Sequence, residues 1–236
     1  MSMEEILSSG MPDLGIAVHP EALEKFRKFY EYMVEKNKVM NLTGITEESE
    51  SARLHFLDCV ALLAAENFAG KRVIDVGTGA GFPGIPLKIA EPTLDITLLD
   101  SLAKRLNFLD EVIDLLGLEN TRTIHARAEE APAEFREQFD IATARAVTRM
   151  DALAELCLPF VKKGGAFVAM KGPAAAEELK EAEKAIKVLG GKVEKLHTYT
   201  IPGTDVTHTA VVIRKVANTP KQYPRSWGKI KKAPIK

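Results

Sequence analysis

Four glycines fall within eight residues of the chain, at Gly77, Gly79, Gly81 and Gly84. The four residues before them, 73–76, are mostly apolar and β-branched, which is typical of a buried strand, and the residues after them resemble the start of a helix. Glycine allows the backbone to approach a ligand closely, and the first turn of a helix offers unpaired N–H groups. The stretch therefore predicts a binding site for a nucleotide-like small molecule.

The spacing of these glycines distinguishes between several types of ligand-binding loop. A dinucleotide-binding loop has the form G-x-G-x-x-G, but Phe82 occupies the position of its third glycine. A phosphate loop of the Walker type is excluded because no Gly-Lys-Ser/Thr follows. The pattern present is G-x-G-x-G with Asp75 two residues upstream, which is typical of the S-adenosylmethionine (SAM) loop of Rossmann-like methyltransferases. A glycine-rich turn without a ligand is the alternative.

Polar residues follow the later predicted strands, at the edge where open α/β sheets bind their ligands. Asp100 ends the second strand and lies 23 residues after Gly77, near the ~20 expected for an acid that binds ribose hydroxyls. Residues 127–129, Arg-Ala-Glu, follow the third strand and suit an adenine. Arg145 directly follows the fourth strand, and Lys171 directly follows the fifth. Their cations suit an anionic group or the cofactor, and an exposed ion pair is the alternative.

These positions depend on an alternation of strands and helices that begins at Arg72. The sequence predicts seven strands, at residues 72–76, 95–99, 121–126, 139–144, 166–170, 193–200 and 209–213. Strands that alternate with helices form a parallel sheet covered on both faces. The last two strands follow one another across a Pro-Gly turn and predict an antiparallel edge. The predicted fold is therefore α/β and Rossmann-like, with a mostly parallel seven-stranded sheet.

Helical patterns precede this sheet, and a basic segment follows it. We expect residues 1–70 to form an N-terminal helical cap, 71–216 the Rossmann-like domain and 217–236 a basic C-terminal tail. His55 and Asp58 lie three residues apart in a helix of the cap and so face the same way. They could contact a substrate or form an ordinary surface pair.

The net charge of −1 conceals an uneven distribution. Residues 214–236 contain eight lysines and arginines and no acid, so the rest of the chain carries −9. A basic segment on an acidic body favours a polyanionic partner, and Tyr223 and Trp227 among the cations suit base stacking. We expect contact with nucleic acid, with a solvated tail as the alternative. Removal of residues 218–236 should weaken RNA binding and leave SAM affinity unchanged.

Other features narrow the class of protein. Cys59 and Cys157 lie in apolar helical contexts and are expected to be buried free thiols, and no cluster of residues has metal-ligand spacing. No apolar run reaches the ~18 residues that span a membrane, and the acidic N-terminus lacks the charge pattern of a signal peptide. A cytoplasmic protein is therefore expected. The chain also lacks the Asn/Asp-Pro-Pro-Tyr/Phe motif of enzymes that methylate amino groups of nucleic acids.

Several short motifs, spread over nearly the whole chain, agree with one family. They are residues 41–43, 53–58, 74–87, 99–105, 127–130, 144–146 and 169–172. Within them, Gly-Phe-Pro-Gly-Ile-Pro at 81–86 is far more specific than the glycine loop alone. With these motifs the chain resembles the RsmG (also called GidB) family of small-subunit (16S) ribosomal RNA guanine-N7 methyltransferases. Residues 219–225 resemble a C-terminal extension that only part of this family has.

The resemblance implies a cofactor, a partner and site residues. The implied reaction transfers a methyl group from SAM to N7 of one guanine in 16S rRNA, free or in the 30S particle, and the chain is expected to be a monomer. Guanine N7 carries a lone pair and no proton, so no general base is required and no catalytic residue is assigned. The expected cofactor contacts are Gly77, Phe82, Ala128, Glu129 and Arg145, together with Gly79, Gly81 and Asp100 from the loop and ribose arguments. The candidates for positioning the RNA are Asn41, His55, Asp58, Arg145 and Lys171.

Two other functions agree with part of the sequence. A nicotinamide-dependent oxidoreductase would share the strand–loop–helix pattern, but Phe82 in place of the third glycine argues against it. A non-catalytic RNA-binding or assembly factor could keep the same fold. The complete glycine loop and the presence of Asp100 argue against the loss of cofactor binding.

Overall fold

The structure is a computed structural model that describes residues 1–145 and 147–235. Its centre is a seven-stranded sheet in the order β3-β2-β1-β4-β5-β7-β6. The strands are β1 (Arg72–Val76), β2 (Asp95–Asp100), β3 (Thr121–His125), β4 (Phe139–Arg145), β5 (Val161–Lys171), β6 (Gly191–Thr200) and β7 (Thr207–Lys215). β1 to β5 are mutually parallel, whereas β7 runs antiparallel to both β5 and β6. The predicted mostly parallel sheet with an antiparallel edge is therefore confirmed.

The strand order reverses direction at the centre of the sheet. β2 and β3 lie on one side of β1, and β4 and β5 lie on the other. Connections that leave in opposite directions open a crevice at the carboxyl ends of β1 and β4, where such sheets bind ligands. The central strands β1 and β4 are mostly buried on both faces, so their side chains alternate between two apolar layers. In β1, for example, Val73 packs in one layer and Ile74 in the other.

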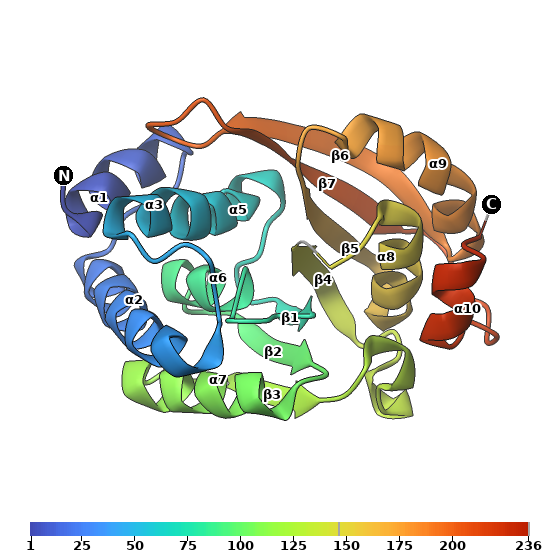
Figure 1. The fold of residues 1–236 in the computed structure, drawn as a ribbon. Helices are drawn as coiled ribbons and strands as arrows, with labels where there is room; N and C mark the ends of the chain where they lie inside the picture. The colour runs from blue at the N-terminus through green and yellow to red at the C-terminus, as the bar shows by residue number, and fades with distance from the viewer. Residues whose placement is uncertain (146, 236) are drawn as a thin grey trace.

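Helices cover both faces of the sheet (Figure 1). One face carries α6 (Gly84–Ala90) and α7 (Ala103–Leu116), and the other carries α8 (Met150–Cys157) and α9 (Ala175–Val188). Short 3-10 turns, Ala128–Glu130, Ala133–Phe135 and Leu158–Phe160, connect these elements. The amphipathic spacing of apolar residues in α7 and α9 explains how each helix faces the sheet.

The N-terminal helices lie over the face that α6 and α7 cover. They are α1 (Met3–Asp13), α2 (Pro20–Met40), α3 (Glu48–Ser51), a π-helical turn (Ala52–Leu57), α4 (Asp58–Val60) and α5 (Leu62–Ala65). Arg27 of α2 joins them by ion pairs to Glu4 of α1 and Glu48 of α3, at 2.6 and 2.8 Å. Buried residues from Met3 to Val212 form one continuous apolar cluster. The 1–70 cap thus shares its core with the sheet.

The C-terminal segment packs against the opposite face. After β7 the chain crosses to α8 and forms the helix α10 (Trp227–Lys232), whose Ile230 is fully buried. The side chains of Tyr223 and Trp227 pack against the apolar cluster of that face. Figure 1 shows α10 beside α8 and α9, far from the N-terminal helices.

The strand boundaries agree with the sequence-based predictions to within two residues, except at the start of β5. In the N-terminal cap, α3 begins at Glu48, because the Glu47 side chain accepts the N–H of Glu50 and caps the helix. β5 begins five residues before the predicted strand and β7 extends two residues beyond each predicted end, because each pairs along a neighbouring strand. Cys59 and Cys157 are buried free thiols, as predicted. Within the described ranges, no helix has the length and apolar character needed to cross a membrane.

Candidate active site

The glycine loop connects the end of β1 to α6. Gly77 has a φ of +72°, and a Cβ built there would lie 2.9 Å from Val147 Cγ2. Gly81 has a φ of +95°, and its Cβ would lie 2.7 Å from Ile85 Cγ1. Both positions combine a left-handed backbone with close neighbours, so only glycine fits them. Asp75 accepts hydrogen bonds from Thr78 Oγ1 and Gly84 N, which closes the loop on itself.

Asp75 is fully buried below this loop. Burial raises the pKa of its carboxyl to about 6. Its Oδ1 atom has no hydrogen-bond partner among the described residues. Both hydrogen bonds from the glycine loop go to Oδ2 of Asp75. Asp75 therefore holds the loop in its conformation from the buried side.

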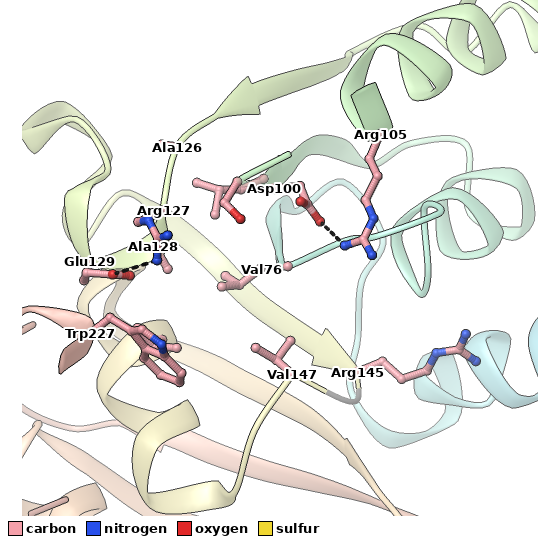
Figure 2. A pocket seen from close by; sticks show the side chains of 14 residues that line it. Val76, Asp100, Arg105, Ala126, Arg127, Ala128, Glu129, Arg145, Val147 and Trp227 are labelled. Atoms are coloured by element: carbon pink, nitrogen blue, oxygen red, sulfur yellow. Dashed lines mark hydrogen bonds and ion pairs between the residues drawn. The ribbon is translucent and has the colours of Figure 1, made fainter. Parts of the chain in front are cut away.

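A cavity of about 370 Å³ opens at the carboxyl ends of β1 to β4. We call it the first cavity (Figure 2). Its lining is Val76, Gly77, Leu99, Asp100, Ser101, Arg105, Ala126, Arg127, Ala128, Glu129, Arg145, Val147, Leu156 and Trp227. It thus brings together five of the predicted cofactor residues, Gly77, Asp100, Ala128, Glu129 and Arg145. Its apolar walls and its carboxylate suit a nucleoside, with the base against aliphatic side chains and the ribose at the acid.

Asp100 is fixed in place by the backbone. Its Oδ2 accepts a hydrogen bond from Gly79 N and its Oδ1 one from Leu102 N, both at 2.9 Å. Arg105 Nη1 lies 3.5 Å from Oδ2. Oδ1 accepts only the N–H of Leu102 and keeps a further lone pair, so a ribose hydroxyl can still donate to it. The predicted role of Asp100 therefore agrees with its position.

Three predicted cofactor residues lie behind the first cavity. Gly79, Gly81 and Phe82, all in the described part of the chain, do not line it. Gly79 contributes its N–H to Asp100, and Gly81 packs against α6. The Phe82 ring is 5% exposed, lies 4.4 Å from the His55 ring, and supports the Arg145 guanidinium at 4.8 Å. Direct contact of these three with a cofactor stays a prediction.

A second cavity, of about 750 Å³, lies beside the first. Its lining is Ile45, Leu54, His55, Asp58, Arg145, Val147, Thr148, Arg149, Met170, Lys171, Gly172, Glu178, Val206 and His208. Four of the predicted positioning residues therefore meet here, namely His55, Asp58, Arg145 and Lys171. Arg145 and Val147 line both cavities, so the two spaces adjoin at the end of β4.

Arg145 is held at this junction by several groups. Its guanidinium donates to Leu54 O and to His55 Nδ1, both at 3.2 Å, and lies 3.7 Å from Asp58 Oδ2. Because an arginine can only donate, His55 Nδ1 accepts and its Nε2 carries the proton, which it donates to Thr43 Oγ1. Burial, together with the charge of Arg145, lowers the pKa of His55 to about 4. His55 is therefore neutral at physiological pH.

Asp58 joins the N-terminal helices to the antiparallel edge of the sheet. Its Oδ1 accepts hydrogen bonds from Tyr199 Oη and His208 Nδ1, both at 2.8 Å. The bond to Asp58 raises the pKa of His208. No sequence pattern indicated His208, because 150 residues separate it from Asp58. Only its inward position on β7 identifies it.

Lys171 and Glu178 form the far wall of the second cavity. Lys171 Nζ lies 2.8 Å from Glu178 Oε2 and donates to Thr148 O at 2.8 Å. Glu178 also accepts the N–H of Met150, so it joins α9 to the start of α8. Arg149, in contrast, pairs with Glu181 at the surface, with both side chains more than half exposed.

The turn after α2 approaches the second cavity through Thr43. Asn37 builds this turn, because its side chain bonds to the backbone of Leu42 and Thr43. Among the described residues, Asn41 is exposed and lines neither cavity. Its φ of +51° instead ends the helix in the left-handed conformation that asparagine tolerates. A role for Asn41 in RNA positioning stays a prediction.

Comparison with known proteins identifies the family. Residues 22–206 match the family model GidB, described as rRNA small subunit methyltransferase G. A protein of Lachnoclostridium phytofermentans named Ribosomal RNA small subunit methyltransferase G is 50% identical over 229 residues, which are 96% of this chain and 95% of that one. The chain belongs to the GidB family. A protein of the same name from Clostridium perfringens is 44% identical over the full length of both chains.

Membership in the GidB family settles the class of reaction. The chain is a methyl-transfer enzyme that takes SAM as its cofactor, and the oxidoreductase and non-catalytic alternatives do not hold. TrmN from Thermus thermophilus is a structural neighbour with a TM-score of 0.54 and 24% identity, covering 68% of this chain and 48% of that one. Such likeness shows the fold, that of a Rossmann-like class I SAM-dependent methyltransferase. Within the described residues, no cluster of side chains could hold a metal ion.

Proposed function

We propose that this GidB-family enzyme transfers a methyl group from SAM in the first cavity to N7 of a guanine of small-subunit rRNA in the second cavity. The observation that carries the proposal is the junction of the two cavities at Arg145 and Val147. A donor and an acceptor that occupy adjoining spaces can meet without crossing solvent. The relatives' names support small-subunit ribosomal RNA as the class of substrate. In this proposal the substrate is 16S rRNA, free or in the 30S particle.

Methylation of guanine N7 requires no acid–base catalysis by side chains. SAM supplies an electrophilic methyl group on a positively charged sulfur. Guanine N7 attacks with an in-plane lone pair and releases no proton, so no general base is needed. The residues of the two cavities then act by alignment, which can supply a large part of the rate enhancement. The neutral His55 and the Asp58-bound His208 agree with positioning roles.

The charges around the second cavity suit a product that becomes cationic at N7. Arg145 and Lys171 would repel such a product if they stood alone. Asp58 lies 3.7 Å from Arg145, and Glu178 lies 2.8 Å from Lys171, so each cation has a carboxylate beside it. The Phe82 ring also faces the guanidinium of Arg145, which further stabilises its charge. Arg145 can therefore lie between donor and acceptor at low electrostatic cost.

The target base must leave the RNA stack to enter the second cavity. Enzymes that modify a base commonly extrude it, at a cost of a few kcal/mol. The lining of the second cavity combines apolar side chains, including Leu54, Val147 and Met170, with polar and charged groups. Such a space suits a flat heterocycle with hydrogen-bonding edges. In this proposal Gly77, Asp100, Ala128, Glu129 and Arg145 hold the cofactor, and the monomer is the active unit.

Methyl transfer from isotopically labelled SAM tests the proposal. The substrates are small ribosomal subunits from a strain without the endogenous enzyme, and free 16S rRNA prepared from them. We expect label at one guanine, located by borohydride reduction and aniline cleavage, which break the chain at N7-methylguanosine. Label at another atom or nucleotide would overturn the N7 assignment.

The Asp58→Asn variant tests the second cavity in the same assay. The substitution keeps the shape of the side chain and removes the charge beside Arg145 and His208. We expect kcat/KM to fall by roughly tenfold or more, as for loss of a group that acts in the transition state, with unchanged affinity for S-adenosylhomocysteine. Asp205→Asn is the matched control, since Asp205 is exposed and lies outside both cavity linings. Wild-type kcat/KM in Asp58→Asn would exclude a role for this carboxylate.

A further inference from the structure

The only tryptophan of the chain lies at the first cavity. Trp227 belongs to α10, and its side chain lines the cavity together with residues from β1 to β4. Figure 2 shows its indole beside Glu129 and Ala128, across the cavity from Asp100 and Arg105. The sequence suggested RNA stacking for this ring, because it stands among lysines. The structure instead packs it against the apolar cluster of the sheet's α8 face.

The segment that carries Trp227 is held by two arginines. Arg136 donates hydrogen bonds to the carbonyl oxygens of Thr219, Pro220 and Tyr223, at 2.7, 3.1 and 2.7 Å. Arg225 bonds through its guanidinium and its backbone N–H to Glu155, which is 1% exposed, at 2.6 to 2.8 Å.

The anchored residues place the start of α10 over the cavity. Ile230 is buried in the cluster that includes α8, so the helix has a fixed orientation. Trp227 stands at the first position of α10. The indole is therefore part of a built wall of the first cavity.

We infer that Trp227 is a cofactor-binding residue whose indole packs on the adenine of SAM. Asp100, at the end of β2, marks the ribose position, and the base must then lie toward the end of β3, where Ala126, Ala128 and Glu129 stand. Trp227 is the aromatic side chain at that end. Stacking of a base on an aromatic ring contributes substantially to affinity and suits an indole well. A segment outside the matched range 22–206 thus completes the SAM site. Removal of residues 218–236 should therefore lower SAM affinity, contrary to the expectation from the sequence.

Calorimetric titration with SAM and with S-adenosylhomocysteine tests this inference without RNA. We expect Trp227→Ala to raise Kd roughly tenfold for both, within the range for loss of a base–aromatic stack, and Trp227→Phe to stay within about threefold of the wild type. Gln222→Ala is the matched control, because Gln222 is exposed in the same segment and lies outside the cavity lining. Its Kd should equal that of the wild type.

Fluorescence gives an independent readout, since Trp227 is the sole tryptophan. S-Adenosylhomocysteine should quench or shift the emission of the wild-type protein in a saturable way, with the calorimetric Kd. The inference would be overturned if Trp227→Ala bound SAM and S-adenosylhomocysteine with wild-type affinity. It would also be overturned if the emission of the wild-type protein did not change at saturating S-adenosylhomocysteine. If Trp227→Ala fails to fold, the wild-type emission still decides. Loss of this inference would leave the N7 proposal untouched, since no acceptor takes part in either measurement.

Discussion

His55 shows how one residue can be kept neutral beside a cation. Its Nδ1 faces Arg145 at 3.2 Å and its Nε2 faces Thr43 at 2.7 Å, so a second ring proton would have to point at the guanidinium. Burial and this charge lower the pKa of His55 to about 4. In the proposed arrangement, a protonated His55 would add a third positive charge beside Arg145 and the sulfonium of SAM. Its neutrality therefore favours the proposed reaction as well as the fold.

The depressed pKa predicts a pH dependence of stability. Between pH 6.5 and 4 the unfolded chain binds a proton at His55 that the folded chain does not, so stability is present above pH 6.5 and is lost as pH falls. The loss amounts to at most about 3 kcal/mol for a shift of this size. Urea denaturation at pH 7 and at pH 4.5 gives the free energy of unfolding at each pH. This free energy should decrease more between the two pH values for the wild type than for His55→Gln. Equal decreases in the free energy of unfolding of the two proteins would contradict the lowered pKa of His55, since His208 and the acids are common to both.

The elements of the sheet were predictable because each is a local pattern. Residues 72–76 and 95–99 are apolar runs that end in chemistry-bearing residues, and the helices between them have clear apolar faces. That alternation also predicted that Gly77 and Asp100 lie at the carboxyl ends of their strands, where they line the first cavity. The same reasoning could not place Trp227 at the first cavity or His208 at the second, because their positions depend on contacts between residues far apart in sequence. An interpretation based on composition treated all the C-terminal cations as exposed charges. The packing instead divides them into cations that form internal pairs and cations that face solvent.

The π-helical turn at Ala52–Leu57 is a second feature that no local pattern showed. It carries His55 within it and is followed at once by Asp58. Such turns are rare and occur often at functional sites, since they redirect side chains within a helix. Here the result is that His55 reaches Arg145 while Asp58 reaches Tyr199 and His208. The N-terminal helices thereby supply one wall of the second cavity.

The C-terminal segment should contribute measurably to stability through one buried pair. Arg225→Ala leaves the Glu155 carboxylate buried at 1% exposure without its cation, which is expected to cost roughly 3 kcal/mol. Arg149→Ala is the comparison, because Arg149 and Glu181 are each more than half exposed and such pairs contribute less than about 1 kcal/mol. Urea denaturation of both variants checks the difference. Equal effects would mean that the anchor of α10 lies elsewhere, for example at Arg136.

Over the whole molecule, the basic C-terminal region divides into internal and external charges. Arg214 pairs with Glu66 and Glu194, Arg225 pairs with Glu155, and Lys215 is 1% exposed and bonds to backbone carbonyls and Thr219. The exposed cations of the region are Lys221, Lys229, Lys231 and Lys232, while Lys236 lies outside the described residues. Three of these lysines belong to α10, the helix that also carries Trp227. Any polyanion drawn to them would therefore be held close to the first cavity.

This arrangement predicts that the α10 lysines strengthen RNA binding through salt-sensitive contacts. The triple variant Lys229→Gln, Lys231→Gln and Lys232→Gln should bind 16S rRNA more weakly at low salt. The slope of log K against log salt should fall by up to about 2, because each phosphate contact on a single strand contributes ~0.7. Gln keeps the helix propensity, so α10 should remain folded.

Three exposed lysines of α9, Lys180, Lys184 and Lys187, provide the matched control, since their replacement by Gln changes the net charge equally. If both triple variants lower the slope alike, binding responds to net charge and not to α10. If neither does, the lysines of α10 are solvated and RNA must be held around the second cavity alone. A loss confined to the α10 variant would place the RNA path across the C-terminal helix, next to the site where the methyl donor binds.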